Sequence, residues 1–337
     1  MLPGRQYNRR AFTIKAWSNQ LLSDSKLQII ETVRASLCKS GQRELPYAFL
    51  YDEIGSALFE VITLLPEYGL TRAETRLLGD HAAAIAAFFS SPVSVAELGS
   101  GTGTKTRLIL EAARSRGPVR YYPIDLSAYA LDGCEQALSA LPGVSIIRLN
   151  RPYLEGLAEA VSLRKPNEAL LVLFLGSTIG NLQPPEADSM LLTIRRLLQP
   201  GDAFLLGADI EKEIDRMLIA YDDPLGVTAA FNLNLLGHLN RLLGADFDRK
   251  AFTHEARYNQ DAHRIEMHLR SRKKQIVTIR AGNFSVCLHE NETIWTESSY
   301  KYEPQELLRM ARRAGFEPVE QWRDEEWPFA LSLWGAV

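Results

Sequence analysis

The stretch VSVAELGSGTGTK, residues 93–105, predicts the fold of this chain. Its first six residues suit a buried strand, and a glycine-rich turn at Gly99, Gly101 and Gly103 follows before a helix opens. Glycine lets the backbone approach a ligand that a Cβ atom would block, and the first turn of a helix offers unpaired N–H groups. The stretch therefore indicates a nucleoside cofactor bound at the turn.

Two acids accompany the glycines. Glu97 ends the apolar strand, where a carboxylate is costly without a partner. Asp125 ends the next strand-like run, where an acid can accept hydrogen bonds from ribose hydroxyls. In the G-x-G-x-x-G pattern of dinucleotide enzymes the third glycine would fall at Thr104. The order E-x-G-x-G-x-G instead resembles the first motif of class I S-adenosylmethionine methyltransferases.

Strand and helix patterns alternate around this motif, as in a doubly wound α/β sheet. We expect strands near 93–98, 119–124, 144–149, 168–175 and 202–208, with helices near 104–115, 127–140, 154–163 and 185–198. Ligands of such sheets bind outside the carboxyl ends of the strands. Besides the glycine turn and Asp125, those ends hold the turn 150–153 and the segment 176–181, whose small and polar residues follow a buried run.

The pattern changes after Ile210. A helix is expected over 227–243, and strands near 252–258, 263–270 and 275–281, which is too much chain for a loop and predicts an inserted second lobe. The run TIWTESSYKY, ending at Tyr302, alternates like a strand and places Glu297 and Ser299 on one face. Upstream helices are expected at 24–38, 55–64 and 74–89, and a helix at 303–314 precedes a C-terminal hairpin.

Composition bounds the class of protein. The 337 residues are 46% hydrophobic and 23% charged, with a net charge of −3, so we expect a soluble enzyme with no nucleic-acid partner. No apolar run reaches the roughly 18 residues of a membrane span. The start MLPGRQYNRR does not resemble an export signal, which favours a cytoplasmic monomer.

Neither cysteine nor histidine predicts a metal site. Cys38, Cys134 and Cys287 are odd in number, far apart and without C-x-x-C spacing, so we expect reduced buried thiols. His263 and His268 lie five positions apart in a predicted strand, which places them on opposite faces. We therefore expect no metal.

Seven blocks together resemble the histidine-specific Nα-methyltransferase family of ergothioneine biosynthesis. They are YDEIGSALFEVITLLPEYGLTRAE, ELGSGTGTKT, PIDLS, LGSTIGNL, AYDDPLGVTAAFNLN, RIEMHL and TESSYKY, in this order from Tyr51 onward. The resemblance implies S-adenosylmethionine-dependent Nα-trimethylation of L-histidine to hercynine. It also implies a class I methyltransferase domain over 73–209 and 302–337, and an α+β substrate-binding lobe over 1–72 and 210–301.

The resemblance also implies roles for individual residues. Glu297 and Ser299 would hold the imidazole ring, with Met267 close by. Tyr68, Asn181 and Tyr221 would hold the carboxylate and α-amino group of the substrate. Of these three, Tyr221 and Asn181 would also orient the reacting amine. The cofactor would be contacted by Tyr51, Gly99, Lys105 and Asp125.

One segment departs from the family pattern. After the third strand the family usually carries an acid followed by an aromatic residue that hold the adenine, whereas this chain has LNRPYLEGL. Asn150 or Pro152 takes the place of the acid. We expect the side-chain carbonyl of Asn150 to accept from the adenine amino group and Tyr153 to pack on the ring.

Three alternatives remain at this stage. The same chemistry could act on another aromatic amino acid such as tryptophan, although an imidazole N–H suits the carboxylate of Glu297 better than an indole would. A nicotinamide-dependent oxidoreductase could use the same turn and Asp125, but the third glycine and an evident hydride-transfer acid are missing. The third alternative is a binding protein that has lost turnover.

Overall fold

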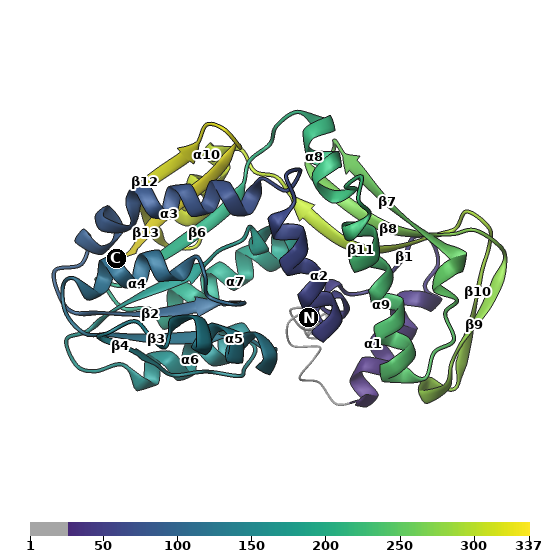
Figure 1. Cartoon of the computed structure of the whole chain (residues 1–337), viewed down its shortest axis with the longest axis horizontal. Helices are drawn as coiled ribbons and strands as arrows, with labels where there is room; N and C mark the ends of the chain where they lie inside the picture. The colour runs from purple at the N-terminus through teal and green to yellow at the C-terminus, as the bar shows by residue number, and fades with distance from the viewer. Residues whose placement is uncertain (1–25) are drawn as a thin grey trace, which may run out of the picture.

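The computed structural model describes residues 26–337 and consists of two halves, each built on its own sheet (Figure 1). Asp24, where the first helix was expected to begin, and the segment MLPGRQYNRR lie outside the described residues. The larger half contains the glycine turn, and the smaller one contains most of the chain between Ile210 and Tyr300.

The larger half is a seven-stranded sheet of order β12-β13-β6-β5-β2-β3-β4. Strands β2 to β6 run parallel to one another, whereas β13 is antiparallel to both β6 and β12. The strands span Val93–Leu98 (β2), Val119–Ile124 (β3), Val144–Ile146 (β4), Ala169–Phe174 (β5), Ala203–Asp209 (β6), Phe316–Asp324 (β12) and Phe329–Ala336 (β13). A parallel sheet closed by an antiparallel C-terminal hairpin is the class I methyltransferase arrangement that the sequence predicted.

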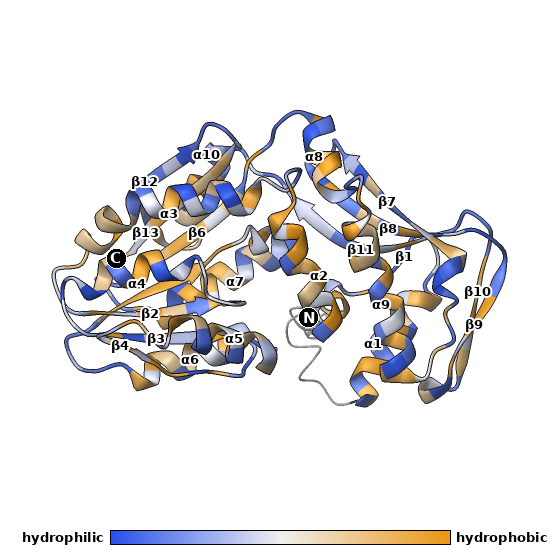
Figure 2. Ribbon diagram, viewed as in Figure 1, coloured by the Kyte–Doolittle hydropathy of each residue, from blue (hydrophilic) through white to orange (hydrophobic). Residues whose placement is uncertain are grey.

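Helices cover both faces of this sheet because its strands alternate between two apolar cores. Val95 of β2 belongs to one core with α3, α4 and α5, and its neighbour Ala96 belongs to the other with α6, α7 and α10. The inner strands β2, β5, β6 and β13 are correspondingly buried along their length and largely apolar, whereas the edge strand β12 is largely polar (Figure 2). The helices are Leu70–Ala87 (α3), Thr106–Arg114 (α4), Ala128–Leu138 (α5), Tyr153–Leu163 (α6), Pro184–Leu197 (α7) and Pro304–Arg313 (α10).

The smaller half is a four-stranded sheet of order β1-β11-β8-β7, with a separate hairpin of β9 and β10. Helix α9 packs on β7 and β8 and also meets α2 from the N-terminal segment, so residues far apart in the chain share one core. The elements span Lys26–Cys38 (α1), Arg43–Glu44 (β1), Tyr47–Leu50 (η2), Glu53–Leu64 (α2), Ile214–Tyr221 (α8), Val227–Leu243 (α9), Arg249–Ala251 (η4), Phe252–Asn259 (β7), Arg264–Ser271 (β8), Gln275–Ile279 (β9), Arg280–Gly282 (η5), Phe284–Leu288 (β10) and Thr293–Tyr300 (β11).

The chain leaves and re-enters the larger half at adjacent points. Ile210, just after β6, forms a parallel bridge with Tyr302, just after β11. The Tyr302 N–H donates to the Asp209 carbonyl, and the Glu211 N–H donates to the Tyr302 carbonyl. An insertion whose ends lie side by side leaves the host sheet undisturbed.

Some expected elements differ from the observed ones. The third strand of the parallel sheet ends at Ile146 rather than at residue 149, and Leu149 forms only an isolated bridge with Ile124. Helix α8 and strand β10 were not expected. They are eight and five residues long, so each shows few periods of its hydrophobic pattern.

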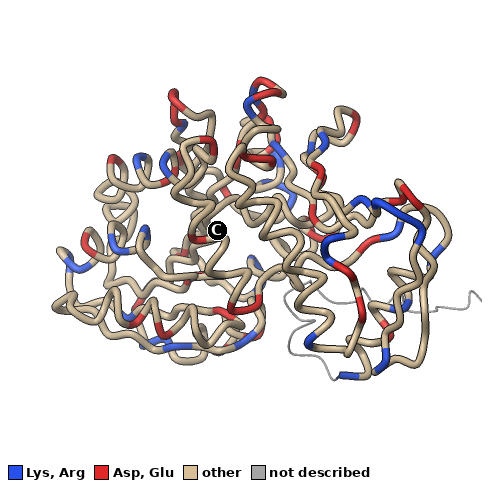
Figure 3. Tube along the Cα trace, turned by 45° about the vertical axis from the view of Figure 1, so that its right-hand side comes forward, with Lys and Arg blue, Asp and Glu red and all other residues tan. Residues whose placement is uncertain are grey.

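Charged residues of both signs are interspersed along the described chain (Figure 3). Over residues 26–337, no helix combines the length and the apolar character that crossing a membrane requires.

Candidate active site

A cavity of about 480 Å³ lies where the two halves meet. The glycine turn and the ends of β3 and β5 line it from the larger half, and α2, α8, α9, β8 and β11 line it from the smaller half. Its volume is within the range of small-molecule sites.

The glycine turn needs glycine for different reasons at its three positions. Gly99, Gly101 and Gly103 all have positive φ, at 75°, 49° and 67°, where a side chain causes strain. A Cβ atom on Gly99 would lie 2.8 Å from Oη of Tyr153, and one on Gly103 would lie 2.6 Å from Sγ of Cys134. A Cβ atom on Gly101 would meet nothing within 4 Å, so its backbone borders open cavity.

Asp125 lies beside this turn with its carboxylate held by backbone amides. Its Oδ1 accepts from the Ser127 N–H at 2.9 Å and its Oδ2 from the Gly101 N–H at 3.3 Å. Burial nevertheless raises the pKa of Asp125 above its ordinary value, because it outweighs the amide hydrogen bonds. Further donors, such as a pair of ribose hydroxyls, would stabilise the charged form, so the site suits a nucleoside.

Glu97 has the partners that its buried position requires. Its Oε2 accepts from Oγ1 of Thr106 at 2.7 Å and from the hydroxyl of Tyr121. Burial raises the pKa of Glu97 to about 7 despite these hydrogen bonds. Because Thr106 begins α4, the carboxylate ties the end of β2 to the helix that follows the glycine turn.

A second buried acid, which the sequence analysis missed, connects three elements around the cavity. Glu74 of α3 is fully buried, pairs with Lys105 through Oε2 and accepts from the Gly176 N–H at 2.7 Å through Oε1. It therefore links the turn after β2 to the turn after β5. The available signal was a carboxylate on the apolar face of a helix, three residues before Leu77.

The other side of the cavity carries side chains from β11. Glu297 and Ser299 both line the cavity, and both are less than 10% exposed. The Asn181 amide donates to Oε1 of Glu297 at 3.3 Å, and Oγ of Ser299 lies 2.7 Å from Oη of Tyr221. Burial raises the pKa of Glu297 to about 8, against the opposing effect of Lys301, so an N–H donor placed beside it would stabilise the charged form.

Tyrosines form much of the remaining wall. The rings of Tyr68 and Tyr221 meet edge to face at 6.0 Å, and Tyr51 packs in the same way on Phe231 at 5.5 Å. Burial raises the pKa of all three phenols well above 10. These hydroxyls are therefore neutral at physiological pH, and they can donate hydrogen bonds but are poor bases. Met267 of β8 adds an apolar contact surface beside them.

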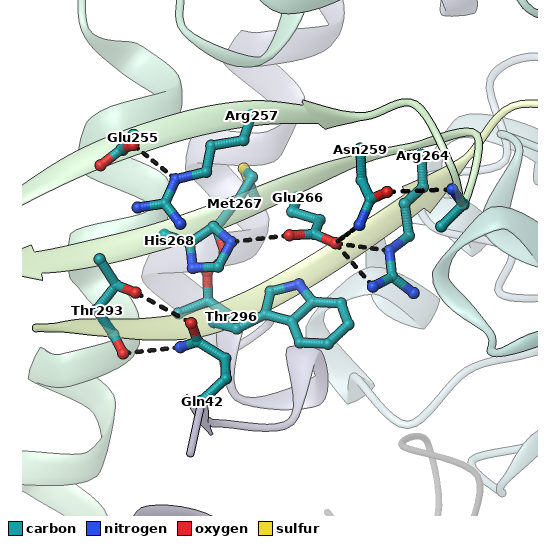
Figure 4. A network of polar contacts seen from close by, with 12 residues as sticks. Gln42, Glu255, Arg257, Asn259, Arg264, Glu266, Met267, His268, Thr293 and Thr296 are labelled. Atoms are coloured by element: carbon teal, nitrogen blue, oxygen red, sulfur yellow. Dashed lines mark hydrogen bonds and ion pairs between the residues drawn. The ribbon is translucent and has the colours of Figure 1, made fainter.

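The opposite face of β8 carries a separate polar network (Figure 4). Nε2 of His268 lies 3.1 Å from Oε2 of Glu266, whose Oε1 accepts from Arg264. His263 instead contacts Glu211 through Nδ1 at 2.7 Å, so the two histidines meet different carboxylates. Among residues 26–337, no group of three or more His, Cys, Asp and Glu side chains could hold a metal ion.

The expected site residues, with one exception, line the cavity: Tyr51, Tyr68, Gly99, Lys105, Asp125, Tyr153, Asn181, Tyr221, Met267, Glu297 and Ser299. The exception is Asn150, which is exposed and does not border the cavity. Its amide group donates instead to the backbone carbonyls of Asp125 and Leu126, at 3.0 and 2.9 Å. These hydrogen bonds use only the N–H groups of the Asn150 amide, so acceptance from the adenine amino group by its side-chain carbonyl stays a prediction.

The sheet order, the glycine turn with Asp125 and the adjoining cavity define a class I S-adenosylmethionine-dependent methyltransferase. The chain belongs to the family described as "Histidine-specific methyltransferase, SAM-dependent", whose model matches residues 29–336. The match begins earlier than Tyr51, so part of the N-terminal segment also belongs to the family. Membership of this family does not favour the alternative of a nicotinamide-dependent oxidoreductase.

Similar proteins carry related names. The histidine N-alpha-methyltransferase of Mycolicibacterium smegmatis is 41% identical over 94% of this chain and 98% of its own length. That of Mycobacterium tuberculosis is 42% identical over 86% of this chain and 90% of its own. Ergothioneine biosynthesis protein 1 of Neurospora crassa is 32% identical over 84% of this chain, which covers 32% of that longer protein.

Proposed function

We propose that the protein transfers methyl groups from S-adenosylmethionine to the α-amino nitrogen of L-histidine until the trimethylated betaine, hercynine, is formed. The observation that carries this proposal is the pair of Glu297 and Ser299 on one strand of the cavity wall. The two side chains can meet the donor and the acceptor of an imidazole ring. The names of the relatives support the same substrate.

The cofactor fits the side of the cavity that the larger half provides. Asp125 would accept the ribose hydroxyls, the amides of the glycine turn would face the amino-acid part, and Tyr153 would pack beside the adenine. The cofactor supplies a methyl group activated by a sulfonium. Lys105, held by Glu74, would fix the turn rather than contribute to the chemistry.

The substrate would lie between this turn and β11. Glu297 would accept the ring N–H, while Tyr68, Asn181 and Tyr221 would hold the carboxylate and direct the amine lone pair. Positioning supplies most of the rate of such an in-line displacement, so no strong base is required. Because the tyrosine phenols stay neutral, they would orient the amine, and water would take the proton that the amine loses.

Repeated methylation requires contacts that do not change between rounds. Each transfer replaces an N–H donor on the amine, whereas the carboxylate and the ring keep their hydrogen bonds. Glu297 and Ser299 would therefore hold the mono- and dimethylated intermediates as well as histidine.

We further propose a monomer that acts on this small molecule in the cytoplasm, without a nucleic-acid or membrane partner. We also propose substrate-lobe boundaries at 1–72 and 210–301 and methyltransferase-domain boundaries at 73–209 and 302–337. The adjacent ends of the insertion at Ile210 and Tyr302 support the division.

The proposal is tested by incubating the purified protein with S-adenosylmethionine and an equimolar mixture of the twenty amino acids, followed by mass spectrometry. We expect only histidine to gain methyl groups, up to three of them. Methylation of tryptophan or tyrosine instead would retain the fold and the cofactor but contradict the role of Glu297.

A further inference from the structure

A buried lysine that does not line the cavity lies directly behind its substrate wall. The side chain of Lys301 is fully buried. Its Nζ donates to Oη of Tyr221 at 2.8 Å and to Oγ of Ser299 at 2.9 Å, and it forms an ion pair with Oδ2 of Asp209 at 2.8 Å. An ammonium group has three N–H bonds, and Lys301 makes three such contacts.

Asp209 anchors this ammonium group and is itself buried at the end of β6. Its Oδ1 accepts from Nζ of Lys212 at 2.7 Å and from Nε1 of Trp327 at 3.1 Å. Burial opposes its ionisation, but the ammonium groups of Lys301 and Lys212 outweigh burial and hold the pKa of Asp209 below its ordinary value. The carboxylate thus holds two lysines, of which only Lys301 reaches the hydroxyls of the cavity wall.

The consequence for those hydroxyls follows from hydrogen-bond chemistry. An ammonium group has donors only, so the oxygens of Tyr221 and Ser299 both act as acceptors toward Lys301. Their protons cannot point back at it and must turn either to the neighbouring hydroxyl, 2.7 Å away, or into the cavity. At most one proton lies between the two oxygens, so a ligand that offers acceptors meets at least one hydroxyl already oriented to donate and can draw the second proton toward itself.

We propose that Lys301 is a positioning residue that makes Ser299 and Tyr221 hydrogen-bond donors toward the substrate, so that the ring must offer an acceptor nitrogen. This inference rests on the proposed function and deepens it. Glu297 accepts the ring N–H, Ser299 donates to the other ring nitrogen, and Tyr221 donates to the carboxylate.

The arrangement selects a ring that has both a donor and an acceptor. Imidazole has both, whereas indole has only a donor and phenyl has neither. A ring without the acceptor would offer no partner in the cavity for the Ser299 proton, and a site built to hydrogen-bond a substrate strongly rejects an analogue that lacks the partner.

The test compares L-histidine with 3-(pyrrol-2-yl)alanine, whose ring keeps an N–H but lacks the acceptor nitrogen. The ratio of the two kcat/KM values is measured for the wild type, Lys301→Met and Lys212→Met. We expect the wild type to prefer histidine by about 30-fold or more, from one buried hydrogen bond. Lys301→Met should reduce this preference at least about fivefold, mainly through KM for histidine.

Lys212→Met is the matched control, because Lys212 pairs with the same carboxylate without touching either hydroxyl. It should keep the wild-type ratio, and Lys301→Arg, which restores a cationic donor, should recover most of the preference. If Lys301→Met lowers kcat/KM equally for both substrates, Lys301 only supports the fold and the inference is overturned.

Binding of S-adenosylhomocysteine serves as the check for folding. If Lys301→Met fails this check, Lys301→Leu replaces that variant, since it likewise offers no donor to Ser299 and should lower the preference in the same way. An unchanged ratio in Lys301→Leu would also overturn the inference. A wild-type protein that does not methylate histidine would contradict the proposed function itself, which is a different result.

Discussion

The two sides of the cavity differ in the parts of the chain that build them. On the cofactor side, the amides of the glycine turn and the carboxylate of Asp125 come from two consecutive strand ends. On the substrate side, Tyr68, Asn181, Tyr221 and Glu297 come from four distant segments and act through their side chains. Because backbone amides exist whatever the residue, the cofactor side can stay constant while the substrate side sets specificity.

The two sides also differ in electrostatics. The carboxylate of Asp125 has backbone donors on both oxygens, whereas the carboxylate of Glu297 accepts, within residues 26–337, only from the Asn181 amide at 3.3 Å and has a raised pKa of about 8. The substrate side is thus less satisfied without its ligand. If this comparison is correct, substitutions on the two sides should affect different measurements.

The largest expected effect is on the cofactor side. Asp125→Ala should weaken binding of S-adenosylhomocysteine about 100-fold, because hydrogen bonds to a charged group are each worth about 1.5–3 kcal/mol. Isothermal titration calorimetry measures this loss of affinity. Asp132→Ala, on the exposed face of α5, is the control and should bind as the wild type does. A loss below threefold for Asp125→Ala would contradict the assignment to the ribose.

A somewhat smaller effect is expected on the substrate side. Glu297→Ala should raise KM for histidine about 30-fold while changing kcat far less, since the carboxylate holds the ring and not the reacting amine. Steady-state kinetics with histidine checks the split, and the affinity for S-adenosylhomocysteine should not change. An unchanged KM would mean that the imidazole is held elsewhere and would remove the distinction between the two sides.

The raised pKa of Glu297 predicts a dependence of stability on pH. Its folded pKa of about 8 exceeds the ordinary value of 4.5, so the folded state binds the proton more tightly and stability falls as pH rises from about 4.5 to 8. Glu297→Gln removes this loss. The unfolding free energy of the variant, relative to that of the wild type, should therefore rise by about 1–2 kcal/mol from pH 5 to pH 9. This figure is smaller than the full pKa shift would give, because the cavity admits water that screens the charge.

Urea unfolding of the ligand-free proteins at both pH values measures this gain. Glu290→Gln, at an exposed position in the same half, should follow the wild type at both. A constant difference between Glu297→Gln and the wild type would show that Glu297 is ionised throughout the range.

The smallest effect is expected at Asn150. Since its amide supports the carbonyls of Asp125 and Leu126 and does not border the cavity, Asn150→Ala should weaken S-adenosylhomocysteine binding only about two- to fivefold. Gln136→Ala on α5 serves as a control. A loss above tenfold would mean that Asn150 turns to the adenine when the cofactor binds.

The sequence predicted most of the larger half because its signals are local. Apolar runs ending in Glu97 and Asp125, and glycines separated by single residues, are periodic features of short segments. Helix α8 and strand β10 escaped prediction because elements of eight and five residues show few periods of their hydrophobic pattern. Glu74 escaped for another reason, since its partners Lys105 and Gly176 lie on other elements.

By itself, the sequence determined the order of the strands and helices in the larger half, the glycine turn, and the face shared by Glu297 and Ser299, because backbone geometry and the two-residue period of a strand set all of these locally. The tertiary structure alone decided that the Asn150 amide supports the carbonyls of Asp125 and Leu126 and that Lys301 stands behind Tyr221 and Ser299. The ion pair of Lys301 joins the end of β6 to the end of β11, more than ninety residues apart. No local period encodes such a contact, because it forms only when the inserted lobe returns beside the strand that it left.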